Sequence, residues 1–222
     1  MNLPFTTEQF LSVFEQYNQA VWPLQLGLNL LGLTAVFLAI RKTVHSNRLI
    51  AVILAFYWLW IGLAYHYSFF THINPAATVF AVLNVIQGIV FLAYGVFSQR
   101  LSFRFTPNVY GLIGACLILY AMVVYPLLGS AFGHAYPRSP TFGLPCPTTI
   151  FTFGLLLWTD TKLPKNVLII TFLWSLIGSS AALTLGIFED TGLLVSGILG
   201  VALIIMRDRK APEQAFGART NI

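Results

Sequence analysis

Five long apolar stretches, each nearly free of charged residues, constrain the fold of this chain more than any other feature of its sequence. Together with two shorter stretches they cover residues 20–40, 49–70, 76–97, 109–129, 142–158, 167–188 and 191–206. A helix needs about 20 apolar residues to cross the hydrocarbon core of a bilayer, which is roughly 30 Å thick. The sequence therefore predicts an all-α, polytopic membrane protein with seven transmembrane helices.

The overall composition supports this prediction and excludes several other classes of protein. Only 9% of the residues are charged, whereas 57% are hydrophobic. In a soluble domain about a quarter of the residues are charged. This chain has too few charged residues to cover a surface that faces water. A soluble enzyme, a disordered chain and a small disulfide-stapled secreted domain are therefore excluded. Cys116 and Cys146 fall in different apolar stretches and give no disulfide framework.

The positions of the basic residues predict how the helices are oriented. With seven spans, eleven of the twelve Lys and Arg residues fall on one side, and Arg138 falls on the other. Because basic loops remain in the cytoplasm, we expect the N-terminus outside and the C-terminus inside. This distribution also explains the net charge of +5 without a nucleic-acid partner.

The two ends of the chain differ from the membrane domain, which we place at residues 20–206. Residues 1–19 are expected to form an outer amphipathic segment, because Phe10, Phe14 and Tyr17 recur at helical spacing. Thr6 and Gln9 have the spacing of a capping box at its start. We expect this helix to lie on the outer leaflet or to pack across the outer mouth of the bundle. Residues 207–222 are expected to form a polar cytoplasmic tail.

Polar side chains within or beside the apolar stretches are the first candidates for a functional site, because they are costly in a membrane. The candidate ligand-binding residues are His66, His72, Asn74, Asn84, Gln87, Cys146, Thr149, Glu189 and Asp190. On the expected orientation nearly all of them lie in the outer half of the bundle. This pattern is typical of a polar cavity that opens outward. Ordinary outer loops above an apolar bundle would give the same pattern.

Several candidates also have a structural interpretation. Asp190 can cap the helix that follows it, which leaves Glu189 available to bind a cation or a proton. Cys146 is expected at an N-cap before Pro147, where the helix dipole favours a thiolate. His66 can hydrogen-bond to the backbone or bind a ligand. Histidines together with the acids or Cys146 are suitable ligands for a transition metal, but their spacing matches no standard motif.

Three motifs carry a resemblance to a known family. They are His66 with INPAA over residues 73–77, GxxCPTTIFTxG over 143–154, and LWSLIGxSAA over 173–182 with Glu189 and Asp190. With these motifs the chain resembles a bacterial family of multi-pass membrane proteins, Domain of Unknown Function 6064, whose members are often labelled permeases. The resemblance implies a multi-pass protein of the cell inner membrane. It implies no reaction and no cofactor.

The sequence leaves three functional hypotheses. The first is transport or binding of a small solute or ion through a polar vestibule that faces outward. The second is a non-catalytic membrane subunit or assembly partner, and the third is a metal- or haem-binding redox protein. No nucleophile-elbow or HExxH motif occurs, so no enzymatic activity is expected. The expected partners are the lipid bilayer, the solute or ion, and a second copy of the chain or a membrane partner chain.

Overall fold

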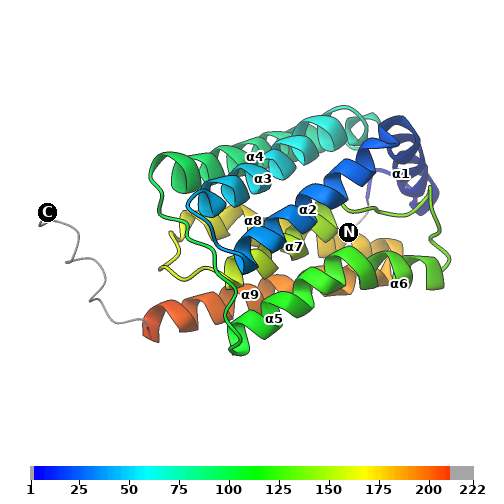
Figure 1. The fold of residues 1–222 in the computed structure, drawn as a ribbon. Helices are drawn as coiled ribbons and strands as arrows, with labels where there is room; N and C mark the ends of the chain where they lie inside the picture. The colour runs from blue at the N-terminus through cyan, green and yellow to red at the C-terminus, as the bar shows by residue number, and fades with distance from the viewer. Residues whose placement is uncertain (1–2, 211–222) are drawn as a thin grey trace, which may run out of the picture.

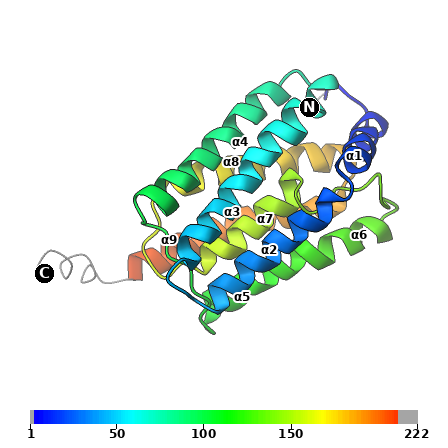
Figure 2. The same ribbon diagram turned by 45° about the horizontal axis from the view of Figure 1, so that its top comes forward.

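The computed structural model describes residues 3–210, which form an all-helical bundle with 75% helix and no strand in this part of the chain (Figure 1). The α-helices are α1 (Thr7–Val21), α2 (Leu24–Ile40), α3 (Ser46–Trp60), α4 (Ala77–Phe91), α5 (Val109–Leu119), α6 (Tyr125–Ala131), α7 (Pro145–Leu157), α8 (Asn166–Leu185) and α9 (Thr191–Lys210). Apart from α1, they run between the same two ends of the bundle (Figures 1 and 2). We call the end where α1 lies the α1 end, and the opposite end, where most Lys and Arg residues lie, the basic end.

Short helical turns of other types continue or join these helices. The π-helical turns are η1 (Ile61–Tyr67) after α3, η3 (Leu92–Phe97) after α4 and η4 (Tyr120–Val124) between α5 and α6. The 3-10 turns are η2 (Phe70–His72) and η5 (Phe188–Asp190). π-Helical turns are uncommon and often occur at functional sites. Two of them, η1 and η4, carry residues of the candidate site described below.

The outer surface of the bundle is apolar over most of its helices. On α2, for example, Leu30 and Phe37 are 63% and 61% exposed. Within the described residues, five helical segments are long and apolar enough to cross a membrane, and the number rises to six if the bent pair α1–α2 forms one span. Such a surface is compatible with a membrane protein, because a leucine side chain that faces lipid tails does not need to be buried against other protein groups.

Helix α7 lies at the centre of the bundle and is surrounded by protein (Figure 2). Each of its residues is buried except Cys146, which is partly exposed. Glycines allow its neighbours to approach closely: a Cβ atom on Gly154 would lie 2.7 Å from the Ile118 side chain and 2.8 Å from the Gly114 carbonyl oxygen of α5. The apolar sequence of α7 therefore reflects burial on all sides rather than contact with lipid.

Helix α1 lies across one end of the bundle, because the chain bends by 87° between α1 and α2. The capping box of Thr6 and Gln9 is present at its start. Its buried face, which includes Phe14 and Tyr17, packs against residues of η1, η2, α4 and α8. Burial raises the pKa of Tyr17 to about 12. Its hydroxyl therefore stays protonated and accepts a 2.7 Å hydrogen bond from Trp60 Nε1.

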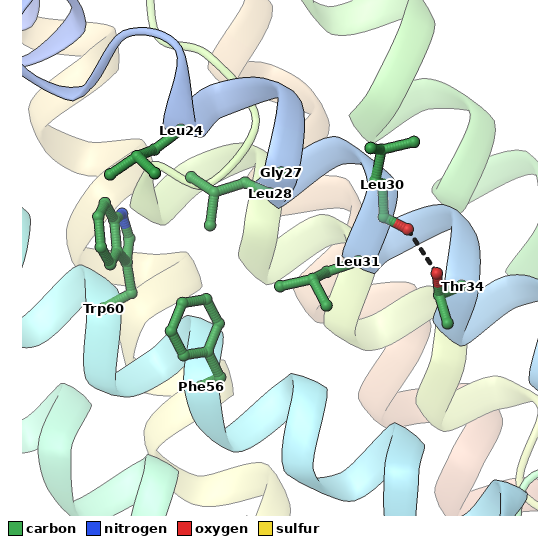
Figure 3. Close-up of a pocket in the computed structure, with 8 residues that line it drawn as sticks. All are labelled: Leu24, Gly27, Leu28, Leu30, Leu31, Thr34, Phe56 and Trp60. Atoms are coloured by element: carbon green, nitrogen blue, oxygen red, sulfur yellow. Dashed lines mark hydrogen bonds between the residues drawn. The ribbon is translucent and has the colours of Figure 1, made fainter.

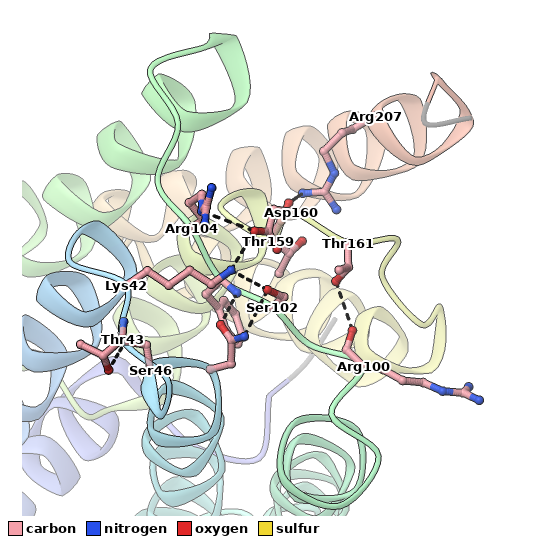
Figure 4. Close-up of polar contacts among 12 residues, drawn as sticks. Lys42, Thr43, Ser46, Arg100, Ser102, Arg104, Thr159, Asp160, Thr161 and Arg207 are labelled. Carbon is pink, nitrogen blue, oxygen red and sulfur yellow. Dashed lines mark hydrogen bonds and ion pairs between the residues drawn. The ribbon is translucent and has the colours of Figure 1, made fainter. Parts of the chain in front are cut away.

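The connection of residues 98–108 runs over the basic end and is joined to it by polar contacts (Figure 4). Lys42 Nζ donates to Asp160 Oδ2 at 2.9 Å and to Ser102 Oγ at 2.8 Å. Arg207 Nη1 donates to the carbonyl oxygens at the C-terminus of α7, including that of Thr159 at 2.9 Å. Cations are favourable at this end of a helix dipole. Within residues 3–210, each Lys and Arg except Arg138 belongs to a connection or terminal helix turn at this end.

Several boundaries differ from the sequence prediction, and those of α9 and α7 matter most for the site. Helix α9 continues past Met206 to Lys210, so it has 20 residues and the expected tail begins inside a helix. The rest of that tail, 211–222, lies outside the described residues. Helix α7 begins at Pro145 rather than at residue 142, and its N-cap is Leu144. Cys146 is therefore inside the first helical turn, and the expected N-cap position for it is wrong.

Candidate functional site

The centre of the candidate site is a pair of carboxylates, Glu189 and Asp190, in turn η5. Helix α8 ends at Gly186, which adopts a left-handed conformation that glycine favours. The short connection that follows turns the chain back into α9 and places both acids inside the bundle. The exposed fraction is 0% for Glu189 and 3% for Asp190. Two adjacent acids are thus buried at the α1 end.

Each carboxylate has protein partners from distant parts of the sequence. Oε1 of Glu189 lies 2.9 Å from Nδ1 of His134. Its other oxygen, Oε2, has no hydrogen-bond partner among the described residues. Asp190 Oδ1 accepts a 2.5 Å hydrogen bond from the Tyr125 hydroxyl, and the Cys146 thiol lies beside the same carboxylate. The carboxylate pair is therefore joined to α6, to α7 and to the connection between them.

The contacts of Asp190 bear on the capping interpretation. Its carboxylate accepts from Tyr125, and no described hydrogen bond joins it to an amide of the first turn of α9. The Tyr120 hydroxyl donates instead to the backbone oxygen of Glu189 at 2.7 Å. Both acids therefore face the tyrosines of η4 and α6, and capping does not account for Asp190.

The charge balance of this group is unfavourable without a further proton or cation. A buried carboxylate is stable only when a partner compensates its charge, and neighbouring carboxylates oppose each other's ionisation. The described partners are His134, tyrosine hydroxyls and the Cys146 thiol, and none of them is a lysine or an arginine. Even with His134 protonated, one negative charge remains. The group can therefore take up a proton or a small cation.

A cover of α1 and the connection 132–144 separates the carboxylates from the surface. Asn18 Nδ2 donates to the carbonyl oxygen of Pro137 at 2.6 Å, and Gln25 Nε2 donates to Asn18 Oδ1 at 2.6 Å. Arg138 forms ion pairs with Glu8 and Glu15 of α1. These contacts join the connection to α1 and α2. The expected polar vestibule is thus covered in this structure.

A pocket of about 290 Å³ lies between α1 and this connection. It is lined by Leu11, Glu15, Gly133, His134, Ala135, Tyr136, Pro137 and Arg138. His134 is therefore both a wall of the pocket and the partner of Glu189. It is the side chain that links the surface to the buried acids.

A second group of buried polar side chains lies between α3, α4 and α8. His66, on π-helical turn η1, is 0% exposed, and its ring centroid lies 4.8 Å from that of Trp174. Asn84 donates to the carbonyl oxygen of Phe80, and Gln87 donates to that of Val167. Asn84 and Gln87 thus share the face of α4 that their spacing predicts.

The other sequence candidates do not join either group. His72 is exposed, and Asn74 Oδ1 accepts from the Ala76 amide at 3.1 Å, which stabilises the turn before α4. Thr149 is buried on α7. Among the described residues, no three His, Cys, Asp or Glu side chains are close enough together to hold a metal ion. The suggested combination of His66 and His72 with the acids or Cys146 is therefore not present among the described residues.

Sequence reasoning missed some residues that the fold brings to these groups. Tyr120 and Tyr125 fall in an apolar stretch, and His134 falls in the connection between two such stretches. A tyrosine hydroxyl deep in an apolar stretch needs a hydrogen-bond partner, which is the signal that could have identified both tyrosines.

An apolar groove of about 380 Å³ lies on the surface between α2 and α3 (Figure 3). Leucines of α2 form one wall, and Phe56 and Trp60 of α3 form the other. Its polar side chain, Thr34, already donates to the Leu30 carbonyl oxygen at 2.7 Å. The groove therefore presents no group that could bind a polar ligand.

A family model covers both groups of buried polar residues. A family of unknown function (DUF6064) matches residues 7–215. The chain belongs to this family. The match confirms the resemblance to DUF6064, and the DUF6064 region extends from the first residue of α1 to beyond the end of α9. No curated protein and no solved structure matches the chain.

Proposed function

We propose that this chain is a seven-span protein of the cell inner membrane that binds a proton or small cation at Glu189 and Asp190. The observation that carries the proposal is the carboxylate of Glu189. It is 0% exposed, one oxygen has no partner among the described residues, and a second buried carboxylate follows it in the sequence. A group of this kind in a membrane is functional more often than structural, because it is so costly to bury.

The seven-span topology has support from the arrangement of the helices. The basic residues gather at one end, which by the positive-inside rule faces the cytoplasm and leaves the α1 end outside. Helix α7 has only 13 residues, which at about 1.5 Å per residue is too short for a full span. Because other helices surround it, α7 does not need to match the thickness of the bilayer.

The pocket lined by His134 provides the route by which a cation reaches the carboxylates. Glu15 on its wall favours cations over anions, while Arg138 is neutralised by Glu8 and Glu15. At the opposite end, Lys42 and Asn47 hold the connection 98–108 against the bundle. The proposed function is therefore binding from the outer side, with carriage across the membrane only when the basic end opens.

Thermal unfolding of the detergent-purified full chain tests this proposal. A ligand that binds only the folded state raises its midpoint in a saturable way. We expect such a rise from one member of a series of alkali cations, ammonium, divalent metals and protons, and its loss in Glu189→Gln. Asp160→Asn serves as the matched control, because Asp160 is a carboxylate at the opposite, basic end of the bundle, where it pairs with Lys42.

Two results would count against the proposal. One is the absence of a saturable shift from every member of the series. The other is an equal shift in wild type and in a well-folded Glu189→Gln variant. Either result favours the subunit hypothesis, for which a co-purifying membrane chain is the direct test.

A further inference from the structure

The group between α3, α4 and α8 contains several buried polar atoms that the protein leaves without partners. We call His66, Trp174, Asn84 and Gln87 the polar seam. Both ring nitrogens of His66, Nε1 of Trp174, Oδ1 of Asn84 and Oε1 of Gln87 have no hydrogen-bond partner within residues 3–210. The exposed fractions of the four side chains are 0%, 7%, 1% and 0%. A buried donor or acceptor without a partner costs about 1–3 kcal/mol.

The amide oxygens are the atoms left over at Asn84 and Gln87. Nδ2 of Asn84 donates to the Phe80 carbonyl oxygen at 2.8 Å, and Nε2 of Gln87 donates to the Val167 carbonyl oxygen at 3.0 Å. Only the NH₂ end of a side-chain amide can donate to a carbonyl oxygen, so these bonds fix which end of each amide is which. Both remaining atoms are therefore acceptors, and they cannot hydrogen-bond to each other.

The spacing of the seam suits small bridging molecules. Asn84 follows Phe80, which contacts both His66 and Trp174, by four residues, a rise of about 6 Å. Gln87 follows Asn84 by three residues, a rise of about 4.5 Å. Two or three hydrogen bonds of about 2.8 Å in succession span such steps. A bridge between two acceptors must donate twice, and a bridge to the Trp174 N–H must also accept.

We propose that the polar seam binds a file of water molecules between α3, α4 and α8, running from His66 and Trp174 past Asn84 to Gln87. Water donates twice and accepts twice, so it satisfies all the atoms of the seam. Buried water commonly bonds to polar groups of this kind and persists as part of the structure. The inference does not depend on cation binding at Glu189 and Asp190, because the seam consists of other residues.

The two tryptophans Trp174 and Trp58 provide an internal test. Trp58 is 0% exposed, and its Nε1 donates to Thr152 Oγ1 at 3.2 Å. Its indole proton already has a protein partner, whereas that of Trp174 has none in the described chain. The full chain, labelled with ¹⁵N-tryptophan, is placed in lipid nanodiscs. Each indole signal is assigned by a Trp→Phe variant, and magnetisation transfer from water is measured together with exchange into D₂O.

We expect a water cross-peak at the Trp174 indole and none at Trp58, with exchange about tenfold faster at Trp174. Asn84→Leu removes one acceptor of the file and is expected to weaken the Trp174 cross-peak. Asn29→Leu is the matched control, because Asn29 also donates to the carbonyl oxygen four residues earlier but lies on α2. It should leave the cross-peak unchanged.

The wild-type comparison decides the matter even if a variant fails to fold. A Trp174 indole without a water cross-peak, and with exchange no faster than that of Trp58, would overturn the proposal. The same conclusion follows if Asn84→Leu folds and is more stable than wild type, since removing a dry, unpartnered amide oxygen stabilises a protein.

Discussion

Tyr125 tests the carboxylate pair at the scale of a single residue. Its hydroxyl donates to Asp190 Oδ1 at 2.5 Å in a buried setting. Tyr125→Phe removes that donor and leaves the carboxylate short of a partner, so we expect the free energy of unfolding to fall by about 1–3 kcal/mol. Unfolding in mixed micelles measures the change. In Asp190→Asn the same substitution should cost less, because the two residues interact directly.

Tyr120→Phe provides the comparison for this prediction. Tyr120 also donates to turn η5, but to the neutral backbone oxygen of Glu189. Hydrogen bonds to charged groups contribute more than those to neutral ones, so the loss at Tyr120 should be smaller. Equal losses in the two variants would show that the hydrogen bond to the Asp190 carboxyl group is no stronger than one to a neutral backbone oxygen.

At the scale of elements, close helix packing around α7 leads to a prediction about Gly154. A side chain there would meet the Gly114 carbonyl oxygen and the Ile118 side chain of α5, and backbone cannot move aside cheaply. Gly154→Val should therefore lower the stability of the bundle by about 1–3 kcal/mol. Gly27→Ala on α2 is the control, because no heavy atom lies within 4 Å of its added Cβ. If both substitutions were tolerated equally, α5 and α7 would not pack as closely as described.

The elements also show what could be predicted from the sequence. Runs of about 20 apolar residues locate the helices: α2 ends at Ile40 and α8 begins at Asn166, each within one residue of its expected boundary. The start of α7 was wrong because Pro145 and Pro147 both suit a first helical turn, and local sequence does not choose between them. A π-helical turn of five to seven residues produces no distinct hydrophobic period in the sequence, so η1 and η4 could not be predicted from it.

The partners in the candidate site were less predictable than the acids themselves. Glu189 and Asp190 are conspicuous because charges are rare in apolar stretches. Their partners His134 and Tyr125 are 55 and 65 positions away, and only the fold brings them together. The same holds for Trp174 of α8, whose ring packs against that of His66 in turn η1. A sequence indicates which polar groups are costly to bury, but not which other residues will form hydrogen bonds or contacts with them.

At the scale of the whole molecule, the proposed topology turns on whether α7 crosses the membrane. Ala135, before α7, and Thr161, after it, are both exposed. If α7 crosses, an impermeant maleimide added to intact cells should label Ala135→Cys, and it should label Thr161→Cys only after permeabilisation. Wild type measures the background from Cys116 and Cys146. Labelling of both variants from outside would mean that α7 returns to the side it started from, and labelling of Thr161→Cys alone would reverse the orientation.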